Sequence, residues 1–172
     1  MERKNHSVWD LYNEYRTARL STLYYEKQLT VSKRWNLMIE IILAATASSG
    51  IAGLWFWWTF AGGVIWKGIL TIAALVAVIK PFVNLAGQIQ QKSELLGYWR
   101  SHGNDLYILI VLVKQRKSYD NEIRNRFISM IEAKKGIIQK EPTEEPNKKL
   151  REKCYNQVNE ELPFNDFFIP EE

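Results

Sequence analysis

The side chains that could support catalysis or metal binding are few and scattered. The two histidines, His6 and His102, lie near the N-terminus and in a stretch of turn-forming residues. This separation indicates neither a metal cluster nor a nucleophile paired with a base. Glu132-Ala133-Lys134 resembles half of a nuclease motif, but its helical surroundings offer no strand to present a second carboxylate. We therefore expect no enzymatic activity, no cofactor and no metal site.

Glu40 is the one acidic residue within the most apolar part of the chain. A charge at the centre of a bilayer costs roughly 2.5 to 3.5 kcal/mol, and less near its edge, so Glu40 needs a partner, water or a proton. One hypothesis pairs it with Lys80 on a returning helix. The other places it in a ring of acidic side chains around a water-filled path. The polar residues that would continue this path are Thr46, Ser48, Ser49 and Thr71.

Small residues follow one face of the same segment. Ala45, Ser49 and Gly53 are spaced four residues apart, which predicts a nearly flat helix surface. Flat faces allow helices to approach closely in lipid, where packing replaces the hydrophobic driving force. The face could close a hairpin within one chain, or it could assemble several copies, and the sequence leaves both open.

The apolar sequence around these residues predicts two membrane spans. No Asp, Glu, Lys or Arg occurs between Ile41 and Trp66, a run longer than the roughly 18 residues that mark a membrane candidate. We expect spans over residues 37–57 and 64–82, joined by a turn at 61–63. The cations that flank the spans are Lys33, Arg34 and Lys80, and the turn has none. The positive-inside rule therefore predicts that both termini are cytoplasmic.

Amphipathic helices are expected on both sides of the spans. Residues 7–34 carry a heptad seam that predicts packing against a partner helix, at Val8, Leu11, Tyr15, Ala18, Thr22, Tyr25 and Leu29. Further helices are predicted over 84–99, 106–113, 120–139 and 148–161, with a turn at 101–104 and a linker at 141–146. A strand is the alternative for 106–113. The aromatic tail over 164–169 is expected to dock on the cytoplasmic helices, or alternatively to bind a partner.

Charge and cysteine content limit the choice of partners. The net charge is +4, and the stretches beside the predicted spans are basic, which favours contact with lipid headgroups. Nucleic acid is the less favoured partner, since no aromatic-basic binding motif accompanies the charge. Cys154 is the only cysteine, so an internal disulfide is excluded and a reducing compartment is expected.

These patterns together predict an all-α membrane protein, a two-span transmembrane hairpin with a cytoplasmic helical module. Residues 1–34 are expected to form an amphipathic N-terminal helix and residues 35–83 the hairpin. A basic helical module is expected over 84–140, and an acidic region with a linker, a helix and an aromatic tail over 141–172. The water-filled path described above would make such a protein a pore. The alternative function is a non-enzymatic scaffold that holds a soluble partner at the membrane.

The chain resembles the SLATT-type two-transmembrane effectors of bacterial anti-phage defence. The likeness rests on Arg16, Arg19, Tyr24 and Tyr25, on Lys33-Arg34 leading into residues 40–57, on Gly62-Gly63, and on Leu95, Tyr98, Trp99 and Arg100. The resemblance implies a toxic effector that oligomerises in the bacterial inner membrane, forms a pore and arrests growth of infected cells. It also implies restraint by a defence-system sensor, either a retron complex or a nucleotide-signalling protein.

Overall fold

The computed structural model describes residues 6–56, 71, 74, 75, 78, 84–142 and 145–170, and it describes no side chains for residues 45–56. The regular structure of this part of the chain consists of helices. The chain divides into two compact units. We call Met1–Lys27 together with Lys92–Glu172 the bundle unit, and Gln28–Gln91 the second unit.

Helix α1 (Val8–Phe56) contributes to both units and forms the centre of the bundle unit. The predicted seam is confirmed, because Val8, Leu11, Ala18, Thr22, Tyr25 and Leu29 are buried and Tyr15 is half-buried. A second buried stripe, which the heptad pattern did not predict, follows Tyr12, Arg16 and Leu23, and Tyr24 is buried as well. Two buried stripes on one helix require neighbours on two sides.

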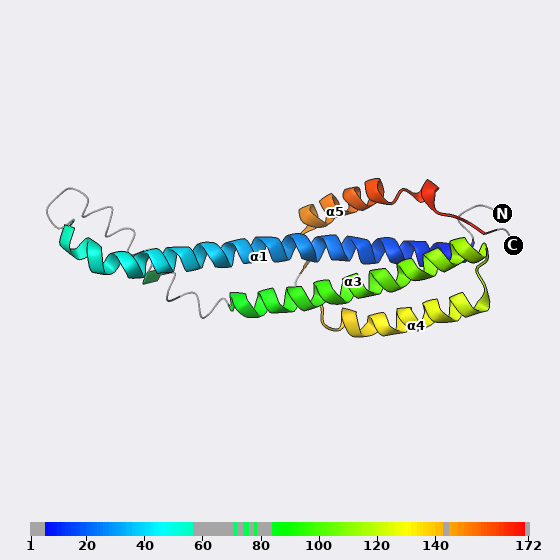
Figure 1. Cartoon of the computed structure of the whole chain (residues 1–172), viewed down its shortest axis with the longest axis horizontal. Helices are drawn as coiled ribbons and strands as arrows, with labels where there is room; N and C mark the ends of the chain where they lie inside the picture. Colours follow the sequence, from blue (N-terminus) through cyan, green and yellow to red (C-terminus); the bar gives the residue numbers. More distant parts are fainter. Residues whose placement is uncertain are drawn as a thin grey trace. The chain divides into compact units, whose positions relative to one another are not determined.

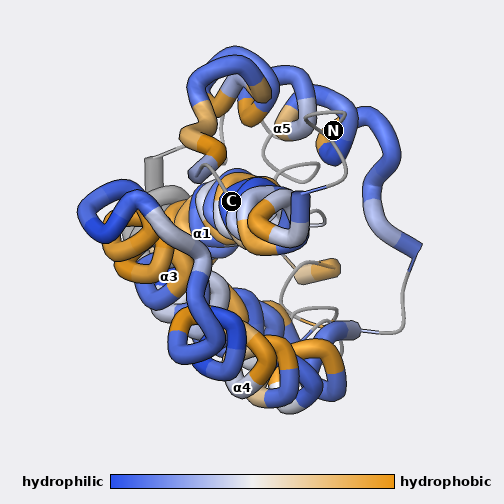
Figure 2. Tube along the Cα trace, turned by 90° about the vertical axis from the view of Figure 1, so that its right-hand side faces the viewer, coloured by the Kyte–Doolittle hydropathy of each residue, from blue (hydrophilic) through white to orange (hydrophobic). Residues whose placement is uncertain are grey.

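Those neighbours are α3 (Leu85–Arg116) and α4 (Asn121–Ile138) on one side of α1, and α5 (Lys148–Glu161) on the other (Figure 1). Figure 2 looks along the helices and shows the same arrangement, with α1 between α5 and the α3–α4 pair. The face that α3 buries is mostly apolar, with Leu95, Leu106, Leu109 and Val113 at most 1% exposed. Full burial of each such side chain is worth about 1.5 to 3 kcal/mol.

Helix α3 runs through the predicted turn at 101–104, and this prediction is wrong. The reason is tertiary packing. His102 contacts Glu14, and a Cβ added to Gly103 would lie 3.8 Å from the Cβ of Ala18, so this part of α3 lies close against α1. These contacts outweigh the weak helix propensity of Ser101 to Asn104. Residues 106–113 are helical as preferred, and the alternative of a strand is wrong.

The last two helices agree with the predicted ranges and have side-chain caps. The Asp120 carboxylate accepts from the backbone N–H of Ile123 at the start of α4, and the Asn147 amide oxygen accepts from that of Leu150 at the start of α5. Such caps satisfy backbone donors that have no partner within the helix. The tail after α5 contains the short 3-10 helix η2 (Phe164–Asp166) and docks on α1, which confirms the first of the two expectations for it.

The prediction of a two-span transmembrane hairpin is wrong. Within the residues that the structure describes, none of the helices combines the length and the apolar character needed to cross a membrane. Residues 37–56 of the first predicted span form the C-terminal part of the continuous helix α1. This part continues from a half of α1 that is packed within the bundle unit, through a stretch with Lys33, Arg34 and Glu40. The second predicted span, 64–82, and the turn at 61–63 lie outside the described residues, apart from residues 71, 74, 75 and 78.

Candidate functional site

The predicted intramembrane acid, Glu40, is exposed on α1. The amide nitrogen Nδ2 of Asn36, one helical turn earlier, donates to Glu40 Oε1 over 2.7 Å. Lys80, the other half of the predicted ion pair, lies outside the described residues, so this pair stays a prediction. Thr71 belongs to the described residues and is exposed.

The other predicted polar and small residues lie in the last part of α1. Thr46, Ser48 and the face formed by Ala45, Ser49 and Gly53 are helical, and their side chains lie outside the description. Because α1 is continuous here, the spacing of four does place the three small residues on one helix face. Their packing against a second helix or a second copy stays a prediction.

A group of large apolar side chains is exposed on α1 just before these positions. We call it the apolar surface of α1: Val31, Trp35, Leu37, Met38, Ile41 and Ile42, with exposed fractions between 38% and 58%. Val31, Trp35, Met38 and Ile42 follow steps of four, three and four, so they form one face. An exposed apolar patch of this kind marks a surface that contacts another protein or a membrane.

The polar side chains of the same stretch lie on a different face. Lys33, Asn36 and Glu40 follow steps of three and four on the side away from Val31 and Met38, and Lys33 and Arg34 are exposed. This part of α1 is therefore an amphipathic helix with two cations beside its apolar surface. The sequence indicated the cations and the apolar residues, but as the start of a span.

A buried charge cluster joins α1, α3 and α4 within the bundle unit. Glu14 Oε1 lies 3.2 Å from His102 Nε2 and 2.8 Å from Lys134 Nζ, and Lys134 also donates to Oε2 over 3.0 Å. The side chains of Glu14, His102 and Lys134 are 13%, 5% and 18% exposed. One carboxylate thus ties three helices together in a place where water has little access.

The environment of Glu14 favours its charged form. Burial alone would raise the pKa of this carboxyl, but the hydrogen bonds and charges of His102 and Lys134 outweigh burial and hold the pKa below its ordinary value. Trp99, 3% exposed, packs its ring edge-on against His102, with centroids 5.9 Å apart. Its indole N–H donates to Glu141 Oε1 over 3.1 Å. The cluster is therefore enclosed by an aromatic side chain that is itself anchored.

Sequence reasoning did not find this cluster. His102 stood in the supposed turn, and Lys134 was considered only within the nuclease-like triplet. The available signal was Glu14, which directly precedes the seam residue Tyr15 and so borders a buried stripe. Charged residues beside a seam often pair across the helix interface.

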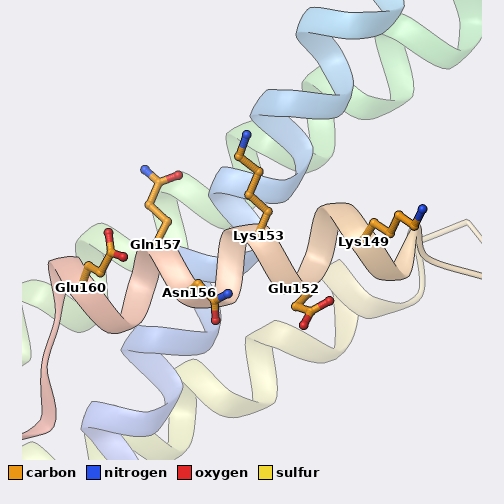
Figure 3. A pocket seen from close by; sticks show the side chains of 6 residues that line it. All are labelled: Lys149, Glu152, Lys153, Asn156, Gln157 and Glu160. Atoms are coloured by element: carbon orange, nitrogen blue, oxygen red, sulfur yellow. The ribbon is translucent and has the colours of Figure 1, made fainter.

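A surface hollow lies on α5, and none of its lining residues belongs to the cluster. The hollow has a volume of about 550 Å³ and is lined by Lys149, Glu152, Lys153, Asn156, Gln157 and Glu160 (Figure 3). All six side chains come from this one helix and are exposed or half-exposed. Among the described residues, no group of three acidic, histidine or cysteine side chains could hold a metal ion. The cluster links α1, α3 and α4 through side-chain contacts.

Comparisons with known proteins give no relative to reason from. No family model, no curated protein and no solved structure matches the chain.

Proposed function

We propose that the chain is a non-enzymatic effector that acts on a lipid bilayer through the apolar surface of α1. The observation that carries the proposal is the exposure of six large apolar side chains between Val31 and Ile42, next to two exposed cations. This contact requires an amphipathic helix at the membrane interface and does not require a helix that crosses the membrane.

The chemistry of this stretch suits an anionic lipid surface better than another protein. Burial of each large apolar side chain contributes about 1.5 to 3 kcal/mol. Lys33 and Arg34 each add about 1 kcal/mol close to an anionic leaflet. Trp35 belongs to the residue type that is enriched at the headgroup level. An apolar surface with cations beside it and an indole on it is typical of helices that lie in the interface.

The proposed effect is permeabilisation by several copies that gather on the bacterial inner membrane, which arrests growth. The small face at Ala45, Ser49 and Gly53 would bring the copies together, since small residues permit close helix contacts in lipid. The restraint by a defence-system sensor, and hence a role in anti-phage defence, follows from the family resemblance and belongs to this proposal.

Vesicles test the proposal directly. The full chain is mixed with vesicles of anionic phospholipid that contain a self-quenched dye, and with vesicles of zwitterionic lipid. We expect binding and dye release with the anionic vesicles, and weaker binding as salt increases, because salt screens exposed charges. The double variant Met38→Asp/Ile42→Asp, which places charge on the apolar surface, should lose both. Asn36→Asp is the control on the polar face, since it adds one carboxylate there and should still bind.

The possible outcomes separate the candidate functions. Loss of binding by Asn36→Asp to the same extent as by the double variant would show that any added acid weakens the contact. Binding without dye release would exclude permeabilisation as the function and would favour the membrane-anchored scaffold. If the parent chain binds neither kind of vesicle, the proposal is wrong.

A further inference from the structure

The tail of the chain occupies a surface that we call the tail site, formed by Trp9, Tyr12 and Arg16 on α1. The Phe167 ring stacks on Tyr12 with centroids 4.3 Å apart and is edge-on to Trp9 at 6.1 Å. The Tyr12 hydroxyl donates to the backbone carbonyl of Phe168. Phe167 is 7% exposed and Tyr12 is fully buried. This half of the tail site is a complete aromatic pocket.

The other half of the tail site, around Arg16, has less favourable polar contacts. The Arg16 guanidinium lies under the Phe164 ring, with Cζ 3.5 Å from the ring centroid, and its Nη2 donates to the Asn159 amide oxygen. Arg16 is 7% exposed, yet its Nε has no hydrogen-bond partner. Within the described part of the chain, no carboxylate pairs with this cation. A buried guanidinium that meets only an amide and a ring lacks its best partner.

The spacing of the two contacts defines what would fit better. Phe164 covers Arg16 and Phe167 fills the aromatic pocket, so the first position of a bound segment lies three residues before the second. A glutamate side chain reaches about as far from the backbone as a phenylalanine ring. A glutamate at the first position would therefore bring a carboxylate to the Arg16 guanidinium.

The resident tail follows the α-helices of the bundle and is not part of them. It ends the described chain at Pro170, and Phe164 at its start is 46% exposed. Terminal segments open at a lower free energy than the core of a domain, so a competing segment can displace the tail.

We propose that the tail site binds a segment of a partner protein, and that this segment has a glutamate three residues before an aromatic residue. The chain's own tail competes with the segment for the same site. The partner segment exchanges the ring over Arg16 for a carboxylate and keeps the ring on Tyr12. A hydrogen bond to a charged group is about twice as strong as a neutral one, which gives such a segment the advantage.

Two labelled peptides test the proposal. The acidic peptide has the sequence of residues 163–170 with Phe164→Glu, and the neutral peptide has Phe164→Gln, which keeps the shape and removes the charge. Binding is measured by fluorescence anisotropy on the full chain with Phe164→Ala/Phe167→Ala, which weakens the resident tail. We expect the acidic peptide to bind about tenfold more tightly than the neutral one, the factor that a net charged hydrogen bond supplies. Arg16→Met in the same chain should abolish the difference.

Equal binding of the two peptides, or binding of neither, overturns the proposal. If the tail variant does not fold, as judged by circular dichroism, a second measurement decides. Asn159→Asp supplies a carboxylate to Arg16 within the chain and should raise the urea midpoint of unfolding, and this gain should vanish in the Arg16→Met background. Absence of coupling between positions 16 and 159 in this double-mutant cycle would equally overturn the proposal.

Discussion

Glu14 on α1 and His102 on α3 meet within the bundle unit, with Oε1 3.2 Å from Nε2. Lys134 on α4 completes the contact from a third helix, 2.8 Å from the same oxygen. The cluster links residues that are far apart in sequence, and its side chains are largely withdrawn from water. Its carboxylate therefore contributes to the stability of the bundle in a way that an exposed ion pair does not.

Replacement of this carboxylate should destabilise the bundle. Glu14→Gln keeps the shape of the side chain but leaves Lys134 buried without its counter-charge, so we expect the unfolding free energy to fall by about 2 kcal/mol. Urea unfolding followed by circular dichroism measures the change. The control is Glu122→Gln, which removes an acid from the exposed pairs with Arg116 and Arg126 and should lower the midpoint much less. Equal effects of the two substitutions would contradict the role of burial.

The same carboxylate should make stability depend on acid pH. The pKa of Glu14 is lower in the folded chain than the value of 4.5 for an unperturbed glutamate, so the unfolded state binds the proton more readily. Stability from this group is present above that value and is lost as the pH falls through the folded pKa. Unfolding free energies measured between neutral and acid pH should therefore fall less steeply for Glu14→Gln than for the parent. Parallel curves for the two chains would rule out Glu14 as the source.

Helix α3 contains two glycines in its interior that should tolerate alanine. A Cβ at Gly97 would meet no atom within 4 Å, and one at Gly103 would lie 3.8 Å from the Cβ of Ala18, an ordinary contact. Because glycine costs roughly 1 kcal/mol relative to alanine within a helix, each substitution should raise the unfolding free energy by about that amount. Thermal or urea unfolding gives the readout. A loss of stability in Gly103→Ala alone would show that α3 and α1 are packed more tightly there.

Much of the helical pattern of the bundle unit followed from the sequence, because its signals are local. The heptad seam of α1 and the range of α5 both depend on residues within a few turns of one another. The continuity of α3 could not be predicted in this way. Residues 101–104 favour a turn locally, and only the contacts of His102 and Gly103 with α1 keep them helical.

The functional residues divide in the same manner. Lys33, Arg34 and the apolar residues near them were visible in the sequence, but composition alone did not distinguish a helix that crosses a bilayer from an amphipathic helix with exposed apolar residues. The charge cluster and the tail site each join residues more than eighty positions apart, such as Glu14 with His102 and Tyr12 with Phe168. No local pattern specifies such pairs, because they result from how the helices pack.

Replacement of Lys117, directly after α3, by glycine should stabilise the fold. Its φ is 53°, in the left-handed region that L side chains other than asparagine and aspartate rarely adopt. Glycine adopts this conformation without steric cost and commonly follows helix ends in it, so Lys117→Gly should stabilise the chain by about 1 kcal/mol. The urea midpoint measures this. Lys114→Gly is the control, because this residue lies within α3 and should lose stability on the same change.

Cys154 provides a direct measure of whether α5 separates from α1. The thiol is fully buried on α5, and the exposed side of the interface is held by the pair of Arg19 with Glu161 at 2.8 Å and by Lys27, which donates to Gln157. A thiol reagent should therefore react slowly with the folded chain and rapidly in denaturant.

Val158→Ala, one turn from Cys154, removes buried apolar volume and should increase the labelling rate through more frequent opening of α5. Tyr155→Ala changes an exposed residue of the same helix and should leave the rate unchanged. Rapid labelling of the parent chain under native conditions would show that α5 is not held against α1 in solution.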